Sequence, residues 1–302
     1  MQILQQNLDD EQRLVAEGSD ANLLVLAGPG SGKTRLLTNV AAYRLRVSQR
    51  ESWRVCCLTF TVEAARQLRS RLRSPDLGRV SRHRSWAGNF HQFSQALLRS
   101  YGHLLGWPRT AGVIPPVDAE ALVSELAVAF GMRNVSAKNI LWAISAQKGR
   151  RPVSVEIDRR GESFIRLAEA YQQRLREAGL RDFDDLLLDA LRLLREHPAV
   201  RRIVQDTFRH VFVDELQDTS QVQLDLLGAL VDDSPTRIFG VADADQMIYA
   251  WRDARPQNLN EFQTRFEAKV VSLGGNYRCP PRIVRAATAV IRNNPDRNQA
   301  VH

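Results

Sequence analysis

Long apolar runs are absent from this 302-residue chain, and none approaches the roughly 20 residues that a helix needs to cross a bilayer. The first residues, MQILQQNLDDEQ, are too polar for a secretory signal peptide. Hydrophobic residues still make up 44% of the chain, enough to bury one large core or two smaller ones. We therefore expect a globular, cytoplasmic protein without a membrane segment.

Cysteine is scarce as well, with only Cys56, Cys57 and Cys279 in the chain. None of them has the C-x-x-C spacing that is typical of a zinc site. Cys56 and Cys57 lie in a strand-like run, where neighbouring side chains point to opposite faces of a sheet. We expect buried thiols rather than a disulfide or a metal site.

Lysine occurs only four times, at Lys33, Lys138, Lys148 and Lys269, against 38 arginines. The net charge is +8, and such a balance favours a polyanionic partner because phosphate contacts release counterions. Codon bias alone would also produce an arginine excess, so composition does not identify the partner.

One of these lysines lies in the most informative stretch of the chain, residues 22–34 (NLLVLAGPGSGKT). A short apolar run at 23–26, typical of a buried strand, leads into a glycine-rich loop. The residues expected to bind phosphate are Gly28, Gly30, Ser31, Gly32, Lys33 and Thr34. Glycines let backbone N–H groups converge on phosphate, the lysine can reach the β- and γ-phosphates, and the threonine can ligate Mg²⁺.

Two features of this loop bear on the interpretation. Ala27 replaces the first glycine of the general G-x-x-x-x-G-K-T pattern, but alanine is small enough to keep the loop close to a phosphate. The alternative is a glycine-rich turn without a ligand. An amphipathic helix expected at 34–47, with Leu36, Leu37, Val40, Ala41 and Leu45 on its inner face, follows in the required order and argues against that alternative.

A second strand-like run, at 210–213, ends in Asp214 and Glu215. Ligands of open parallel sheets bind beyond the carboxyl ends of the strands, so Asp214 is expected to hold Mg²⁺. Glu215 would orient and deprotonate the water that attacks the γ-phosphate. A charged loop after a core strand is the alternative, and the phosphate loop earlier in the chain weakens it.

Strands and helices alternate around both motifs, which predicts an α/β fold with a central, mostly parallel sheet. The other expected elements are a helix from Asp9 with Leu14 and Val15 facing inward, strands at 54–60, 84–88, 237–241 and 270–273, and helices at 62–72 and 280–293. A proline-rich linker at 108–117 precedes a segment that we expect to be wholly helical to about residue 196. The helices expected there lie at 118–130, 136–147, 161–178 and 184–196, with acidic residues capping the last one.

Seven short motifs follow one another along the chain: LDDEQ at 8–12, AGPGSGKT at 27–34, TFTVEAA at 59–65, GNFH at 88–91, DELQDT at 214–219, ADADQMIYAWRDA at 242–254 and GNYRC at 275–279. Their order is similar to that in superfamily one DNA helicases of the UvrD, Rep and PcrA type. The chain resembles this family over essentially its whole length. The resemblance implies a RecA-like P-loop NTPase motor domain from residues 1–107 and 184–275, an all-α accessory insertion at 108–183, and the start of a second RecA-like domain at 276–302.

The resemblance also implies roles around bound ATP and Mg²⁺. Gln12 would read the adenine edge, and Arg35 and Tyr277 would sandwich the base. Gln246 would touch the γ-phosphate, and Arg278 would place positive charge on the departing phosphate. The implied catalytic residues are Lys33, Asp214, Glu215, Gln246 and Arg278, and the implied metal ligands are Thr34 and Asp214.

On the DNA side, the resemblance assigns base stacking to Phe60, Tyr249 and Trp251, a contact worth about 1–3 kcal/mol per base. His91 and Arg252 would contact either the DNA backbone or the nucleotide pocket. Val62 and Glu63 replace the family's Asn-Lys pair, and Asn89 replaces its threonine. We expect the acid at position 63 to weaken phosphate contact there.

The leading interpretation is the motor half of an ATP-dependent helicase or translocase that binds single-stranded DNA or a single-strand/duplex junction. The resemblance implies 3′-to-5′ movement in the complete protein and a nucleoid-associated location, with repair, replication and defence all open. The later motifs of the family lie beyond this sequence, so a missing C-terminal half or a protein partner would complete the ATP site. The isolated chain is therefore expected to hydrolyse ATP weakly or not at all.

Two alternatives stay open at this point. One is a truncated module that binds ATP and DNA without unwinding and acts with a partner. The other is an unrelated P-loop ATPase or GTPase. The sequence weakens this second alternative, because it has no guanine-reading N-K-x-D motif and has Gln12, Gln246 and Tyr277 at the positions expected from the helicase motifs.

Overall fold

The computed structural model describes residues 8–48, 51–77, 83–149, 161–246 and 256–293. The chain forms two compact units, one from Met1–Gln92 and His197–His302 and the other from Phe93–Glu196. The chain leaves the first unit within helix α5 (Phe90–Tyr101) and returns after helix α10 (Phe183–Glu196). The insertion expected at 108–183 thus lies inside the second unit, which also contains most of α5 and all of α10.

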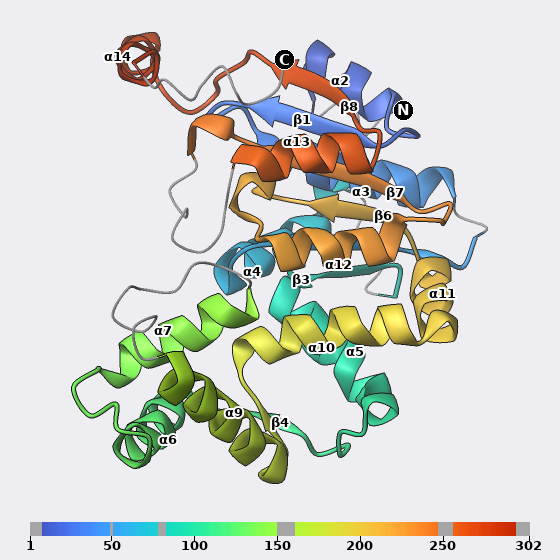
Figure 1. Ribbon diagram of the computed structural model, residues 1–302. Coiled ribbons are helices and arrows are strands. Elements are labelled where there is room, and N and C mark those ends of the chain that lie inside the picture. The colour runs from blue at the N-terminus through green and yellow to red at the C-terminus, as the bar shows by residue number, and fades with distance from the viewer. Residues whose placement is uncertain (1–7, 49–50, 78–82, 150–160, 247–255, 294–302) are drawn as a thin grey trace. The chain divides into compact units, whose positions relative to one another are not determined.

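The first unit is built on a six-stranded sheet in the order β3-β2-β6-β7-β1-β8, and each neighbouring pair is parallel (Figure 1). The strands are β1 (Leu23–Ala27), β2 (Arg54–Thr59), β3 (Ser85–Asn89), β6 (Phe208–Val213), β7 (Arg237–Ala242) and β8 (Lys269–Leu273). The predicted α/β fold with a central parallel sheet is confirmed.

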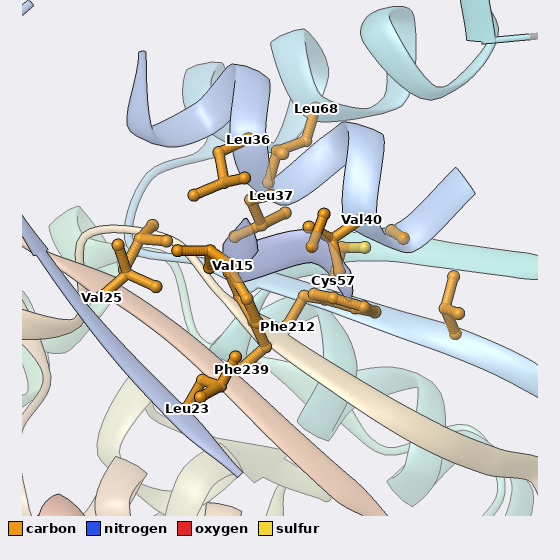
Figure 2. Packing of buried hydrophobic residues seen from close by; sticks show 14 of the residues in the cluster. Val15, Leu23, Val25, Leu36, Leu37, Val40, Cys57, Leu68, Phe212 and Phe239 are labelled. Carbon is orange, nitrogen blue, oxygen red and sulfur yellow. The ribbon is translucent and has the colours of Figure 1, made fainter. Parts of the chain in front are cut away.

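Helices cover both faces of this sheet (Figure 1). Helices α2 (Asp10–Glu17), α3 (Lys33–Val47) and α4 (Val62–Leu72) share one hydrophobic core with β1, β2, β6 and β7, part of which is seen in Figure 2. Helices α12 (Gln221–Val231) and α13 (Pro256–Arg265) lie on the opposite face, and α11 (Pro198–Thr207) contacts α12 and β6. At Gly240 of β7 an added Cβ would lie 3.0 Å from the Phe262 ring, so the small residue lets α13 approach the sheet closely.

The core confirms most of the expected inner positions. Leu36, Leu37, Val40, Ala41 and Leu45 of α3 are all buried. In α2, Val15 is buried but Leu14 is 71% exposed, so the inward position expected for Leu14 is wrong. Helix α2 instead turns Gln12, Val15 and Ala16 inward.

The cysteines are all free thiols. Cys56 and Cys57 are buried in β2, as expected, and Cys57 belongs to the core shown in Figure 2. Cys279 is only half-buried, so the prediction of a buried thiol is wrong at that position.

The second unit contains α6 (Pro116–Ala129), α7 (Ala137–Lys148), α9 (Gly161–Glu177) and α10, and α6, α7 and α9 enclose a core of their own. It is not wholly helical, because β4 (Gly112–Val113), inside the expected linker, pairs with β5 (Leu180–Arg181). At the start of α10, the Asp182 carboxylate caps the helix by accepting the Asp185 N–H at 2.9 Å. The carboxylates of Asp182 and Asp185 also bind the Nζ atom of Lys148, at 2.5 and 2.7 Å. The sequence did not predict this contact.

The first unit also has helices that were not expected from the sequence, namely α11, α12 and α13. The remaining helix of this unit, α14 (Pro281–Ile291), falls within the range expected for it. None of the helices in the described part of the chain is long and apolar enough to cross a membrane.

Candidate nucleotide-binding site

The loop after β1 is shaped to receive an anion. Gly30 and Gly32 have φ values of 76° and 82°, in the left-handed region that favours glycine. Gly32 is the N-cap residue of α3, and no side chain caps that helix end. The first turn of α3 also contains no acidic residue. Its N–H groups and helix dipole are therefore directed at the space where a phosphate would bind.

Lys33, at the start of α3, is held inside the site. Its Nζ donates to the carbonyls of Ala27 and Gly28 at 3.0 and 3.3 Å and to Asp243 Oδ2 at 3.2 Å. Asp243 directly follows β7, which lies beside β1 in the sheet, so the two carboxyl ends bring these side chains together. Burial raises the pKa of Asp243, and the charge of Lys33 opposes that rise.

Asp214, directly after β6, is a second buried carboxylate of the site, at 3% exposure. Burial and then the neighbouring charge of Glu215 raise its pKa to about 6, while a hydrogen bond from Thr34 opposes the shift. Its Oδ1 atom is buried without a hydrogen-bond partner. A buried, unpartnered carboxylate oxygen next to a threonine hydroxyl fits the oxygen ligands that Mg²⁺ prefers.

The described residues contain no group of three His, Cys, Asp or Glu side chains placed to hold a metal. A protein cage for a cation is therefore absent from the described part of the site. Mg²⁺ in nucleotide sites is usually held by one or two protein groups together with substrate phosphates. Thr34 and Asp214 are the residues here that fit such a role.

A hydrogen-bonded chain joins the ends of β6 and β7. Gln217 donates through Nε2 to Glu215 Oε2 at 2.7 Å and accepts the Asp243 N–H through Oε1 at 2.9 Å. Gln246 donates to Asp243 Oδ2 at 2.7 Å. Glu215 has φ 53°, a left-handed conformation that is strained for a residue with a side chain. This series of hydrogen bonds therefore fixes the Glu215 carboxylate relative to Asp243 and Gln246.

Asp218 lies beside this chain and was not expected to belong to the site. It is only 7% exposed, and its Oδ1 atom has no hydrogen-bond partner. Burial, and secondarily the charge of Glu215, raises its pKa to about 7. Asp218 adds a second perturbed carboxyl group on the β6 side of the site.

Segment 276–278 docks against the phosphate loop. The Tyr277 N–H donates to the Gly30 carbonyl at 2.8 Å, and Asn276 Nδ2 donates to the Pro29 carbonyl at 2.5 Å. An added Cβ at Gly30 would lie 2.7 Å from Arg278 Cβ, so this approach requires glycine. The candidate residues Tyr277 and Arg278 are thus placed beside the loop.

Gln12 also contacts the phosphate loop. Its side chain is 4% exposed and donates to the Ser31 carbonyl at 2.9 Å. The Tyr277 hydroxyl donates to Asp9, the N-cap residue of the same helix α2. Tyr277 is 65% exposed and Arg35 is exposed, so both present free surface near the loop.

The candidate DNA residues are only partly described by the structure. Phe60 directly follows β2 and is half-buried, and His91 is half-buried in the first turn of α5. Tyr249, Trp251 and Arg252 lie outside the described residues. Glu63, the acid that departs from the family pattern, binds Arg66 through two hydrogen bonds of 2.9 and 2.8 Å.

Comparison with known proteins agrees with this architecture. DNA helicase II of Haemophilus influenzae is 33% identical over 299 residues, which cover 96% of this chain and 41% of the relative. ATP-dependent DNA helicase PcrA of Staphylococcus epidermidis is 30% identical over 308 residues, which cover 98% of this chain and 41% of the relative. The chain therefore spans less than half the length of these relatives. Residues 8–267 match the family described as the UvrD/REP helicase N-terminal domain, and the chain belongs to that family.

Proposed function

We propose that this chain is the ATP-hydrolysing motor half of a DNA helicase or translocase. One observation carries the proposal: the carboxyl ends of β1, β6 and β7 bring together a phosphate-loop lysine, a buried carboxylate with an unpartnered oxygen, and a glutamate held by a glutamine. The relatives named DNA helicase II and ATP-dependent DNA helicase PcrA support DNA and ATP as the ligands.

Each residue of the site then has a distinct task. Lys33 neutralises the β- and γ-phosphates, and Thr34 and Asp214 hold Mg²⁺. When bound, that ion neutralises charge on the phosphate oxygens. Glu215, held by Gln217, accepts the proton of the attacking water. Gln246, which donates a hydrogen bond to Asp243, would respond to the γ-phosphate.

The base of ATP would lie against the surface next to the loop. Arg35 and Tyr277 supply a guanidinium plane and an aromatic ring for stacking. Gln12 already donates one N–H to Ser31, which leaves its amide oxygen for the exocyclic amine of adenine. Arg278 would stabilise charge on the departing phosphate.

Single-stranded DNA is the second ligand. Phe60, Tyr249 and Trp251 would stack on its bases, and His91 and Arg252 would contact its backbone or the nucleotide pocket. The net charge of +8 favours such a polyanion. Movement from 3′ to 5′ and action at a single-strand/duplex junction belong to the same proposal for the complete protein.

Calorimetric titration with ATP and Mg²⁺ tests the nucleotide site. We expect measurable binding by the wild-type chain and a loss of at least about tenfold in Lys33→Ala, because the phosphates lose their buried cation. Lys138→Ala, which removes an exposed lysine of α7, is the matched control and should bind as the wild type does. An unchanged affinity in Lys33→Ala would remove the phosphate-loop assignment.

Binding to a single-stranded oligonucleotide tests the DNA site. Trp251→Ala should weaken this binding by about 1–3 kcal/mol and leave ATP affinity nearly unchanged, since only base stacking is lost. Trp142→Ala, at a 44% exposed tryptophan of α7, controls for loss of an aromatic residue. Equal oligonucleotide binding by Trp251→Ala and the wild type would rule out the stacking role.

A module that binds ATP and DNA without unwinding would use the same residues and act with a partner. The mass of the native protein on a denaturing gel separates the two proposals. A band at 34.2 kDa would favour the module, and a band well above that mass would favour the complete motor.

A further inference from the structure

Three arginines lie along helix α4 and at its C-terminal end. Arg66 and Arg69 are in the helix and Arg73 is its C-cap residue, and their i, i+3 and i+7 spacing directs them to similar sides of the helix axis. Together with Ser70, Ser74 and Pro75 they line an open hollow of about 580 Å³. None of the described lining residues is a carboxylate, although Glu63 binds Arg66 and Asp76 accepts a hydrogen bond from Ser74 at 3.2 Å, so the arginines leave the hollow with a net positive charge. We call Arg66, Arg69 and Arg73 the α4 arginine face.

The helix that carries this face is firmly held by the rest of the unit. Ala65, Leu68 and Leu72 of α4, each one position before an arginine and so about 100° away around the helix axis, are buried and anchor the helix in the core. Arg69 donates to the Ala87 carbonyl of β3 at 3.0 Å, which fixes its guanidinium group at the rim of the hollow. Arg66 and Arg73 are exposed to solvent. The charges are therefore presented from a rigid base.

The chemistry of the hollow matches a nucleic-acid backbone. Guanidinium groups and serine hydroxyls are the usual donors to phosphate oxygens. Arg73 lies seven positions after Arg66, about 10 Å along the helix axis, which is close to three base-pair steps of a DNA strand. The three arginines therefore lie within the span of about four successive phosphates of one strand.

None of the described residues that line the hollow is aromatic. Surfaces that bind single strands combine basic groups with aromatic rings on which the bases stack. In a duplex the bases are already stacked inside, and backbone contacts suffice to hold it. We propose that the α4 arginine face binds the sugar–phosphate backbone of double-stranded DNA. This site goes beyond the proposed motor function and requires neither ATP binding nor hydrolysis.

Glu63 bears directly on this site. Its carboxylate binds Arg66 through two hydrogen bonds, and both side chains are well exposed. The acid therefore offsets part of the positive charge at the N-terminal end of the face. Its removal frees Arg66 for phosphate, so Glu63→Gln should bind duplex more tightly than the wild type.

The test is fluorescence anisotropy with a short, blunt-ended duplex over a series of salt concentrations. Arg73→Gln should lower the duplex affinity several-fold and reduce the slope of log K against log salt by about 1. Arg66→Gln combined with Arg73→Gln should reduce that slope by about 2. Glu63→Gln should raise the affinity at low salt.

Arg71→Gln is the matched control. Arg71 is exposed on the same helix, two residues from Arg73, but points about 200° away from it around the helix axis. We expect the duplex affinity and the salt slope of Arg71→Gln to equal those of the wild type. Thermal unfolding of each variant establishes that all of them are folded.

Three results would overturn the proposal. The first is that the wild type does not bind the duplex at low salt. The second is that Arg71→Gln loses as much duplex affinity as Arg73→Gln does. The third is that Arg73→Gln loses as much affinity for a single-stranded oligonucleotide as for the duplex. ATP binding, measured on the same proteins, is a separate readout. A wild type that fails to bind ATP would refute the motor function and leave the duplex result standing.

Discussion

The Nζ atom of Lys33 lies 3.2 Å from Oδ2 of Asp243, and the two side chains are only 8% and 3% exposed. This ion pair joins the phosphate loop after β1 to the end of β7. Lys33 therefore has an anionic partner before any nucleotide is bound. In the proposed function, the phosphates of ATP would compete with the carboxylate of Asp243 for this ammonium group, or share it.

Asp243→Asn should destabilise the nucleotide-free chain and increase the stabilisation that ATP and Mg²⁺ provide. Loss of the Asp243 carboxylate leaves the buried charge of Lys33 uncompensated, and breaking such a pair typically costs about 3–5 kcal/mol of stability. Bound phosphates restore the anionic partner, so the rise in Tm on adding ATP and Mg²⁺ should be larger than in the wild type. Scanning calorimetry with and without nucleotide measures both effects.

The control for this change is Asp206→Asn, which alters an exposed ion pair with Arg209. Exposed pairs contribute little to stability, so its Tm should change only slightly. The same nucleotide-induced rise in Tm for Asp243→Asn and the wild type would contradict competition for Lys33.

Gln217→Glu should destabilise the protein. The new side chain keeps an acceptor for the Asp243 N–H but loses the donor to Glu215 and brings two carboxylates together, which repel each other. Urea unfolding of the variant and the wild type measures the loss.

Gln217→Ala provides the comparison, because it removes both hydrogen bonds without adding charge. It should cost about 1–3 kcal/mol, since the buried Asp243 N–H is left unsatisfied. An unchanged free energy of unfolding in Gln217→Glu would show that Gln217 does not hold the Glu215 carboxylate.

His210→Phe should make the folded protein more resistant to acid. Burial, and secondarily the charge of Arg44, lowers the pKa of His210 to about 4 from 6.5. The unfolded chain therefore binds this proton first, and the stability contribution of neutral His210, present above pH 6.5, is lost as pH falls towards 4. Phenylalanine keeps the ring contact with Trp53, whose centroid lies 5.1 Å away, and cannot titrate.

The free energy of unfolding of the wild type, relative to His210→Phe, should fall by about 3 kcal/mol across that pH range. The raised pKa values of Asp214 and Asp218 act in the opposite direction, because their folded forms bind protons before the unfolded chain does. Both proteins share those carboxyls, so the comparison isolates His210. Parallel stability curves would show that His210 does not titrate between the two states.

Gly30→Ala should weaken ATP binding and lower stability by about 1–3 kcal/mol, the usual cost of a strained backbone position. Gly30 has φ 76°, and an added Cβ would lie 2.7 Å from Arg278 Cβ and 2.9 Å from Asn276 Oδ1. Segment 276–278 would have to move off the loop. Gly161→Ala, where an added Cβ meets nothing within 4 Å, is the control for stability, and an equal effect of both changes would contradict the docking argument.

Sequence reasoning found the elements whose pattern is local. The strands β1 and β6 each have a short apolar run that ends in polar residues with a clear chemical role. Helix α12, QVQLDLLGALV, is buried on nearly all sides, and such an apolar run cannot be told from a buried strand. Strands β4 and β5 have two residues each, too few for any period to appear.

The candidate site was predictable as a set of residues but not as a set of contacts. The pairing of Lys33 with Asp243 depends on β7 lying next to β1, and that strand order cannot be predicted from any local sequence pattern. The link from Glu215 through Gln217 depends on the same neighbourhood of β6 and β7. The roles assigned to individual residues at the ATP and DNA sites remain predictions.

The strand order also determines when the phosphate loop can form during synthesis. In the part of the sheet that the structure describes, β1 pairs only with β7 and β8, with Leu23 opposite Phe239 and Lys269. Strand β1 therefore waits until β7 and β8 have been translated. The helical unit, Phe93–Glu196, is complete earlier and has its own core. Domains generally fold as units during translation, so we expect the helical unit to fold before the phosphate loop is fixed in the sheet.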